Sequence, residues 1–398
     1  MNPALDQLLQ QDLDTLEAGA RRRRLRALNM VEGRLQDAQG HTLIDASSND
    51  YLGLSQHPLV KARAAEWAQR HGAGAPSSRL VTGTRGITLA VEEKLAAFKR
   101  CEAALLFSSG FQANATVIPA LARAGDMANA AEIFSDALNH ASMVHGCRAA
   151  RATTQVFRHN DLNHLDELLR RCAAPHKLIL TESVFSMDGD RADLPALVQL
   201  AERHGATLYV DEAHATGVLG PQGRGLAAGC GQSGGRVDVV MGTLGKALGA
   251  FGAYIAGSRT LIDWLVNRCP GFIYTTALPP AVLGAVDAAL DLVPHMDAER
   301  ERLARNSQRL REVLTLRNYD TLSSSTQIVP AVIGSEADAL AAAQLLDRTG
   351  IIAVAIRPPT VPVGSSRLRL TLSSSLGEDE MQRLLDAVAA SLPPRTGV

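Results

Sequence analysis

The chain has 398 residues, of which 46% are hydrophobic and 20% are charged, and its formal net charge is −1. This length and composition predict a globular protein with a sizeable core and more than one domain. The near-zero net charge excludes a whole-molecule field that would attract nucleic acid or an anionic membrane.

The sequence shows no pattern typical of a membrane span, a signal peptide or a disulfide framework. No apolar run reaches the roughly 18 residues that span a bilayer, and the N-terminus has an early acidic residue and no apolar stretch of the signal-peptide kind. The five cysteines are scattered without a Cys-x-x-Cys pair, which argues against a disulfide framework and a zinc site. We therefore expect a cytoplasmic protein with no membrane or nucleic-acid partner.

The first part of the chain combines a helix with a basic run. Leucines at helical spacing predict an amphipathic helix over residues 1–20. Arg21–Arg24 follows, with Arg26 close behind, and is typical of a solvated turn that complements the helix dipole. The alternative is that one of these arginines binds an anionic substrate. The elements expected next are a hairpin, a helix and a small-residue loop, at residues 35–45, 58–70 and 72–79.

Strand and helix patterns then alternate as far as about residue 260. Strands are expected at residues 103–107, 132–134, 154–157, 177–181, 207–210, 237–241 and 253–256, with helices at 87–99, after 108, after 140, at 161–171 and at 195–204. This alternation predicts βαβ units and a mostly parallel sheet that helices cover on both faces.

The last part of the chain predicts a smaller α/β domain. Helices are expected at residues 281–292, 297–314, 336–348 and 378–392, and strands at 326–333, 351–356 and 367–372. The expected division is a helix and arm at 1–45, a large domain at 46–290 and a small domain at 291–398.

Lys246 is unusual among the five lysines of the chain, because only Gly, Ala, Leu and Thr flank it. A lysine amine is a nucleophile when neutral, and apolar surroundings favour its neutral form. Arginine cannot form a Schiff base, so a lone lysine here suggests that chemistry. On this segment alone, a lysine that caps a helix or extends to solvent is an equally good interpretation.

Other polar residues follow the predicted strands, and ligands of open α/β sheets bind at the carboxyl ends of strands. They are a helix start at Ser109–Phe111 that suits an anion, Ser186, Asp211 with His214, and Thr243 with Lys246. Pyridoxal 5′-phosphate (PLP) requires such a set: a lysine, an anionic aspartate at the ring nitrogen, phosphate donors and a partner for the ring hydroxyl. Taken singly, Asp211 could cap a helix, Ser186 could shape a turn, and His140 or His214 could be an ordinary satisfied histidine.

Rival sites have weaker support. A Ser-His-Asp hydrolase would be expected to carry a Gly-x-Ser-x-Gly elbow between a strand and a helix, and no strand predicted in this sequence leads into one. Gly220–Gly225 has the wrong spacing for a nicotinamide-binding loop. His140 and His145 are five positions apart, so they share a helix face poorly and do not suggest a metal site.

Seven stretches in fixed order resemble the α-oxoamine synthases, a family of fold-type I PLP enzymes. They are Ser47–Leu54, Ser109–Asn114, Asp136–His140, Thr181–Asp190, Val210–Gly217, Thr243–Lys246 and Tyr274–Thr276. The resemblance extends from about residue 20 to the end. It implies a large domain with a mostly parallel mixed sheet flanked by helices, a smaller C-terminal α/β domain, and a PLP-dependent acyltransferase activity.

Within this family, Ala355–Gly364 followed by Arg367–Leu372 is most similar to the biotin-pathway branch. That branch joins L-alanine to a pimeloyl thioester, carried by CoA or by acyl carrier protein, and releases CO2. The alternative within the family is a sibling that uses glycine or another acyl-CoA, because one methyl group is worth only about 1–3 kcal/mol to a pocket. An alternative of another class is a non-catalytic binding protein with the same fold.

The resemblance also implies the cofactor site, namely Gly110, Phe111, His140, Ser186, Asp211, His214, Thr243, Lys246 and Thr276. Lys246, His140 and Asp211 would be catalytic: Lys246 would hold PLP and move the substrate Cα proton, Asp211 would pair with the ring nitrogen, and His140 would stack on the ring. Ser186 and His214 would hold the ring hydroxyl. Thr243 would lie near the phosphate, and Thr276 would reach it from the second subunit of a homodimer.

The implied substrate site consists of Arg23, Asn49, His140, Thr360 and Arg369, and no metal ligand is implied. Asn49 and Arg369 would bind the substrate carboxylate, and Arg23 and Thr360 the acyl substrate. The arginine run offers several registers for Arg23. The loop at 72–79 departs from the more glycine-rich form of the family.

Overall fold

The computed structural model describes residues 2–124, 131–230 and 237–394. Two compact units are present. The larger unit comprises Asp50–Ser186 and Arg191–Glu301, and the smaller unit contains both ends of the chain together with Met187–Asp190. The predicted three-part division at residues 45 and 290 stays a prediction.

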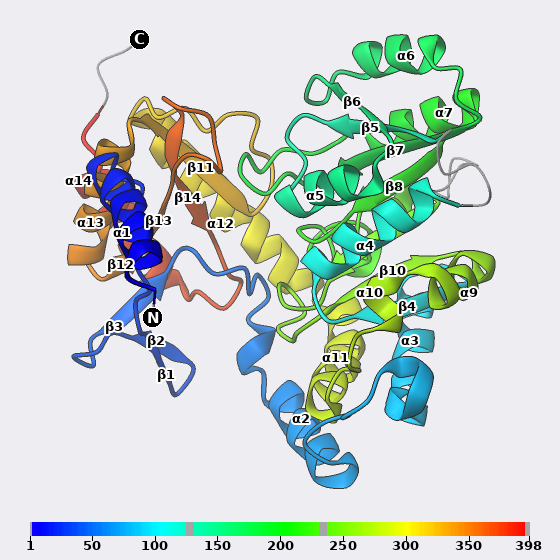
Figure 1. Cartoon of the computed structure of the whole chain (residues 1–398). Helices are drawn as coiled ribbons and strands as arrows, with labels where there is room; N and C mark the ends of the chain where they lie inside the picture. The colour runs from blue at the N-terminus through cyan, green and yellow to red at the C-terminus, as the bar shows by residue number, and fades with distance from the viewer. Residues whose placement is uncertain (1, 125–130, 231–236, 395–398) are drawn as a thin grey trace. The chain divides into compact units, whose positions relative to one another are not determined.

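A seven-stranded sheet forms the centre of the larger unit (Figure 1), in the order β4-β10-β9-β8-β7-β5-β6. The strands are β4 (Ala103–Phe107), β5 (Ala131–Asp136), β6 (Thr153–Phe157), β7 (His176–Glu182), β8 (Thr207–Asp211), β9 (Val239–Thr243) and β10 (Ala253–Gly257). Only β10 is antiparallel to its neighbours in this sheet. β4 and β10 are buried along their whole length, and β8 is buried in all but its first residue, as expected for a sheet covered by helices. The predicted mostly parallel sheet is confirmed.

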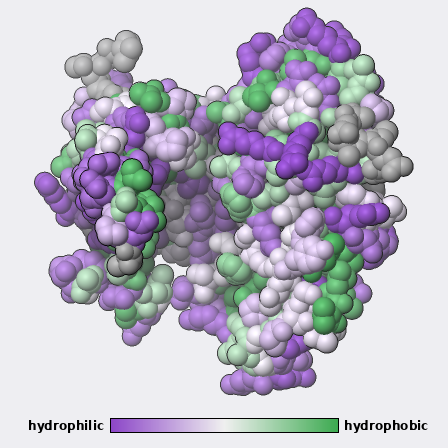
Figure 2. Space-filling view, in the orientation of Figure 1, coloured by the Kyte–Doolittle hydropathy of each residue, from purple (hydrophilic) through white to green (hydrophobic). Residues whose placement is uncertain are grey.

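Ten α-helices of the larger unit accompany this sheet in the described ranges. They are α2 (Pro58–His71), α3 (Gly86–Lys99), α4 (Gly110–Ala122), α5 (Ala141–Ala150), α6 (Leu162–Arg171), α7 (Leu194–His204), α8 (Ala227–Cys230), α9 (Arg259–Arg268), α10 (Pro270–Ile273) and α11 (Pro280–Leu292). Amphipathic patterns orient them: α6 buries Leu165 and Leu169, and Figure 2 shows a hydrophilic surface where α6 lies. Shorter turns are η1 (Leu54–Gln56), η2 (Arg79–Gly83, a π-helix), η3 (Pro221–Gly223) and η5 (Val293–His295).

Two sheets are present in the smaller unit. One has the order β11-β14-β13 and the other β1-β2-β3-β12. The elements are α1 (Pro3–Ala18), β1 (Asn29–Val31), β2 (Arg34–Gln36), β3 (Thr42–Asp45), β11 (Ile328–Gly334), α13 (Glu336–Arg348), β12 (Ile351–Ile352), β13 (Val354–Ile356), β14 (Ser366–Thr371) and α14 (Glu378–Ser391). Helix α12 (Asp297–Leu316) carries the chain from the larger unit into the smaller one.

Two differences from the sequence-based elements have clear physical reasons. The helices α9 and α10 were not predicted, because α9 buries only Ile262 and Leu265 and so has a narrow apolar stripe. The single strand predicted at 351–356 is two strands. β12 pairs in parallel with β3, whereas β13 pairs antiparallel with β14, so the chain changes sheets at Ala353.

None of the helices in the described ranges combines the length and the hydrophobicity that a membrane crossing requires.

Candidate active site

The amine of Lys246 contacts a buried imidazole at the edge of the seven-stranded sheet. Lys246 follows β9, and its Nζ lies 2.7 Å from Nε2 of His214, which follows β8. The other ring nitrogen of His214 lies 2.7 Å from the hydroxyl of Tyr51. Both His214 and Tyr51 are buried, and a buried polar chain of this kind restricts the lysine side chain to one region. The structure therefore brings two predicted residues together and adds Tyr51.

Asp211 ends the neighbouring strand β8 and is also buried. Its Oδ2 accepts a hydrogen bond from Nδ2 of Asn114 at 2.8 Å, and its Oδ1 accepts one from the backbone N–H of Ala213 at 2.9 Å. A carboxylate has about four acceptor positions. These two bonds therefore orient Asp211 and leave it able to accept from a further cationic donor, such as a protonated ring nitrogen.

The start of α4 lies against Thr243 at the end of β9. The hydroxyl of Ser109 caps the helix by accepting from the N–H of Gln112 at 3.1 Å. A Cβ atom on Gly110 would lie 2.7 Å from Cγ2 of Thr243, so only glycine allows this approach. A helix N-terminus beside a threonine hydroxyl is a suitable site for phosphate. The neighbouring Phe111 is exposed, with its ring 5.5 Å from that of His145.

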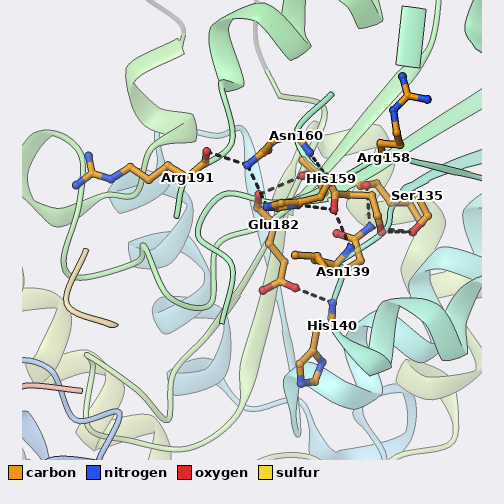
Figure 3. Close-up of polar contacts among 12 residues, drawn as sticks. Ser135, Asn139, His140, Arg158, His159, Asn160, Glu182 and Arg191 are labelled. Atoms are coloured by element: carbon orange, nitrogen blue, oxygen red, sulfur yellow. Dashed lines mark hydrogen bonds and ion pairs between the residues drawn. The ribbon is translucent and has the colours of Figure 1, made fainter. Parts of the chain in front are cut away.

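His140 lies at the N-terminus of α5 and is exposed at this sheet edge. Its backbone N–H donates to Oε1 of Glu182 at 2.6 Å (Figure 3). Desolvation by neighbouring atoms lowers the pKa of the imidazole; the charge of Asp211 raises this pKa and that of Lys246 lowers it. The three predicted catalytic residues are therefore electrostatic neighbours in the larger unit.

Glu182 is a buried acid at this site that the sequence interpretation did not single out. Burial raises the pKa of its carboxyl group well above the ordinary 4.5, and the charge of Asp211 raises it further. Lys246 and the N–H of His140 oppose this shift without reversing it. Both causes favour the uncharged form of the Glu182 carboxyl group, which would place less negative charge beside Asp211.

We expect Glu182→Gln to leave the fold intact and to remove a pH dependence of stability. A carboxyl group whose folded pKa lies above its unfolded value loses folding free energy as the pH rises from the unfolded pKa towards the folded one. Glutamine cannot ionise, so the free energy of unfolding of the variant should fall less than that of the wild type between about pH 5 and pH 8. Denaturant unfolding across this range measures the difference, and a steeper fall in the variant would show that Glu182 is ionised.

Two further predicted cofactor residues also lie in the larger unit. Ser186 is buried in the loop after β7. Thr276 is exposed and forms an isolated antiparallel bridge with Ser78. An exposed position suits the predicted contact with another subunit, which stays a prediction.

The predicted carboxylate-binding residues meet in the smaller unit. Both terminal nitrogens of Arg369, on β14, lie 3.3 Å from Oδ1 of Asn49. Arg369 is buried. A guanidinium can bind a carboxylate through two parallel hydrogen bonds, so this side chain has the chemistry that the predicted role requires.

Arg23 differs from the other arginines of the run at residues 21–26, which lies in the smaller unit, in its ion pairing. Ion pairs involve Arg21 with Glu336 at 2.6 Å, Arg22 with Glu17 at 3.6 Å, Arg24 with Glu17 at 2.7 Å and Arg26 with Asp347 at 2.6 Å. Within the described ranges, Arg23 makes no such pair, and it is exposed. Burial lowers the pKa of Arg357, and the charge of Arg23 lowers it further. These two cations are therefore close enough to attract one anion.

Thr360 lies on the loop that follows Arg357. It is exposed, and its backbone N–H donates to the carbonyl oxygen of Arg357 at 3.1 Å. The loop thus brings this predicted acyl contact close to the Arg23 and Arg357 pair, and its role in substrate binding stays a prediction.

The residues of the larger unit fit PLP. Lys246 offers an amine, Asp211 a buried carboxylate with free acceptor capacity, and Gly110 with Thr243 a helix start that a Cβ atom would obstruct. Three residues with contacts here, Tyr51, Asn114 and Glu182, lay inside stretches that carried the resemblance. Their place in those stretches is the sequence feature that could have identified them as residues of the site.

Comparisons with known proteins agree with this geometry. A family model described as aminotransferase class I and II matches residues 41–388. A putative 8-amino-7-oxononanoate synthase of Bordetella pertussis is 57% identical over 97% of both chains. The 8-amino-7-oxononanoate synthase of Gluconacetobacter diazotrophicus is 54% identical over 96% of both. A solved structure of SPT with a PLP internal aldimine superposes with a TM-score of 0.88 at 29% identity, covering 98% of this chain and 97% of that one.

Proposed function

Because the chain belongs to the class I and II aminotransferase family and, within it, to the 8-amino-7-oxononanoate synthases, we propose that it condenses L-alanine with a pimeloyl thioester. The fold-type I architecture, the PLP dependence and the acyltransferase class that were predicted are confirmed. The proposed products are 8-amino-7-oxononanoate, CO2 and the free thiol of the carrier, in a step of biotin biosynthesis.

The contact between Lys246 and His214, beside Asp211, is the observation that carries this proposal. PLP would supply an aldehyde that an amine can capture and a ring that takes up the electron pair released at the substrate Cα. Asp211 would hold positive charge at the ring nitrogen, and His214 with Ser186 would orient the ring hydroxyl. Gly110 and Thr243 would bind the phosphate.

Lys246 would also move the proton of the substrate. Once its amine is released to the substrate side, its nitrogen can accept the Cα proton of alanine and later return a proton to the product carbon. The 2.7 Å contact with His214 supports this role, because the imidazole can share the proton and hold the amine in place.

Arg369 and Asn49 would bind the carboxylate of alanine. A guanidinium binds a carboxylate through two parallel hydrogen bonds, which fixes its orientation. This carboxylate later leaves as CO2, so its binding selects the bond at Cα that breaks. The carbon–carbon bond forms between Cα and the thioester carbonyl carbon, and the thiol departs with a proton.

Arg23 would bind the acyl donor, and its lack of an ion pair in the described ranges supports that choice over its neighbours. We expect Arg23→Ala to raise KM for the acyl thioester by about 10–100-fold, the effect of one charged hydrogen bond. KM for alanine should change little. Arg24→Ala is the matched control, because Arg24 pairs with Glu17 at 2.7 Å. Equal effects of both variants on the acyl KM would refute the assignment.

A substrate panel tests the proposed reaction. Purified PLP-loaded protein is assayed with alanine, glycine and serine against pimeloyl, acetyl, succinyl and palmitoyl thioesters, on CoA and, for pimeloyl, on acyl carrier protein. We expect the highest kcat/KM for alanine with a pimeloyl donor, and mass spectrometry should detect 8-amino-7-oxononanoate. A preference for glycine, or for another acyl chain, would instead identify a sibling synthase.

We also propose that the protein is a homodimer, and the cytoplasmic location stays a prediction. Leu80, Val81 and Leu89 are 52%, 76% and 49% exposed in the larger unit, and Figure 2 shows hydrophobic residues gathered over α3. An apolar patch of this kind suits a second copy. We expect the wild type to sediment as a dimer and Val81→Asp to shift it towards monomer, while a wild-type monomer would contradict the proposal.

A further inference from the structure

A buried hydrogen-bonded chain connects the aspartate of this site with its exposed histidine. The hydroxyl of Tyr209 donates to Oδ1 of Asn114 at 2.7 Å. Nδ2 of Asn114 donates to Asp211 at 2.8 Å and to Oγ of Ser142 at 2.9 Å. Oγ of Ser142 lies 2.7 Å from Nδ1 of His140. Asn114 and Ser142 are 0% and 1% exposed, so water does not compete for these bonds.

The direction of each bond in this chain follows from its chemistry. Burial raises the pKa of Tyr209 well above its usual value, so its hydroxyl keeps its proton and donates. Oδ1 of Asn114 therefore accepts, and its amide hydrogens point to Asp211 and Ser142. Oγ of Ser142 accepts from Asn114, which leaves its own proton for Nδ1 of His140.

A second bond identifies Nδ1 of His140 as an acceptor. The backbone N–H of Ser142 also points at this nitrogen, at 3.2 Å, so the imidazole caps helix α5. A protonated Nδ1 would face this N–H and would lose the cap. The positive end of the α5 dipole further disfavours a charged imidazolium.

Close packing of α4 against α5 makes the chain possible. A Cβ atom on Gly146 of α5 would lie 2.6 Å from the carbonyl oxygen of Asn114 on α4. Glycine at this position therefore lets the two helices approach closely enough for the side chains of Asn114 and Ser142 to meet.

We propose that Asn114 and Ser142 are positioning residues that hold His140 as a neutral imidazole with its proton on Nε2. This nitrogen has no hydrogen-bond partner among the described residues, and the ring is exposed, so Nε2–H can donate to an oxygen of the bound substrate. The tautomer stands on the geometry alone, whereas the use of Nε2–H rests on the proposed function. The same amide of Asn114 orients Asp211, so one side chain positions two of the three catalytic residues.

Nitrogen NMR of protein labelled with ¹⁵N-histidine tests the tautomer directly, with and without PLP. The signals of His140 are assigned by their loss in His140→Gln. We expect an unprotonated Nδ1 and a protonated Nε2 in the wild type at neutral pH. In Ser142→Ala the hydroxyl donor is gone, so the two tautomers should mix, and kcat should fall about 10-fold, as it does when a hydrogen-bond partner behind a functional histidine is lost.

Two variants separate this role from a general effect on folding. Ser142→Thr keeps a hydroxyl and should keep the Nε2–H tautomer. Ser307→Ala removes an equally buried hydroxyl, which donates to the carbonyl of Leu303 at 2.7 Å in the smaller unit, and should leave the His140 signals unchanged. A protonated Nδ1 in the wild type, or an unchanged tautomer in a folded Ser142→Ala protein, would overturn the proposal. The predicted tautomer without synthase activity would refute the proposed function and leave the positioning role standing.

Discussion

Lys246→Ala is expected to lower turnover by at least about 10³-fold. One side chain supplies both the amine that binds the cofactor and the base that moves the Cα proton, and general acid–base catalysis alone contributes about 10²–10⁴-fold. The measurement is kcat for product formation at saturating PLP and both substrates. The variant should still fold, because Lys246 lies in a loop after β9 and not in the buried core of the sheet.

Lys61→Ala is the matched control, because Lys61 is exposed on α2. It should retain wild-type turnover. A Lys246→Ala protein that turns over at the wild-type rate would remove the lysine from the mechanism.

Asp211→Asn is expected to lower kcat by about 10²–10³-fold, the usual effect of removing one electrostatic contact that the transition state needs. Asparagine keeps the size of the side chain and can still accept from Ala213, but it brings no negative charge to a ring nitrogen. The spectrum of bound PLP should change as well, because its ring loses its ionic partner. Steady-state kinetics and absorbance of the same preparation measure both effects.

Asp136→Asn is the control for Asp211→Asn. It tests whether removing any buried carboxylate at this edge of the seven-stranded sheet lowers kcat equally. Asp136 ends β5 and accepts from the N–H groups of Leu138 and Asn160 at 2.8 and 2.9 Å. Its carboxylate also contacts His159, which Figure 3 shows together with Asn160. This variant should lose stability and keep most of its kcat. Equal losses of kcat in both variants would contradict a specific role for Asp211.

The mostly parallel sheet and the grouping of Asp211, His214 and Lys246 at its edge could be predicted from the sequence, for a physical reason. The parallel strands β8 and β9 are mostly apolar before their last residues, so the polar Asp211 and Thr243 mark their carboxyl ends. Carboxyl ends of neighbouring strands meet at one edge, which brought Lys246 and His214 together before any coordinates were known. The antiparallel direction of β10 could not be predicted in this way, since it depends on the path of the chain between β9 and β10.

Other features depend on tertiary packing that no local pattern records. Asn114 meets Ser142 because Gly146 lets α5 approach α4, and the raised pKa of Glu182 arises from burial and from Asp211 on a neighbouring strand. The register of the arginine run is another case. Arg22 and Arg24 pair with the nearby Glu17, but Arg21 and Arg26 pair with Glu336 and Asp347, which are more than 300 positions away in sequence.

Lys246 differs from Lys94 and Lys99 in the group that its amine contacts. Burial alone would lower the pKa of Lys99, but Glu212, 2.6 Å away, raises it strongly, so Lys99 stays a paired cation. Lys94 lies 2.7 Å from both Asp287 and Asp291. Neither amine is a good nucleophile in these ion pairs, whereas Lys246 faces an imidazole.

Reduction of the PLP-loaded protein with borohydride, followed by peptide mass spectrometry, tests the central claim most directly. Borohydride makes the link between a lysine amine and the cofactor permanent, so the modified residue can be identified. We predict a single pyridoxyl group on the peptide that contains Lys246, and no label at that site in Lys246→Ala. A label on Lys99 or on another lysine, with the Lys246 peptide unmodified, would contradict the account.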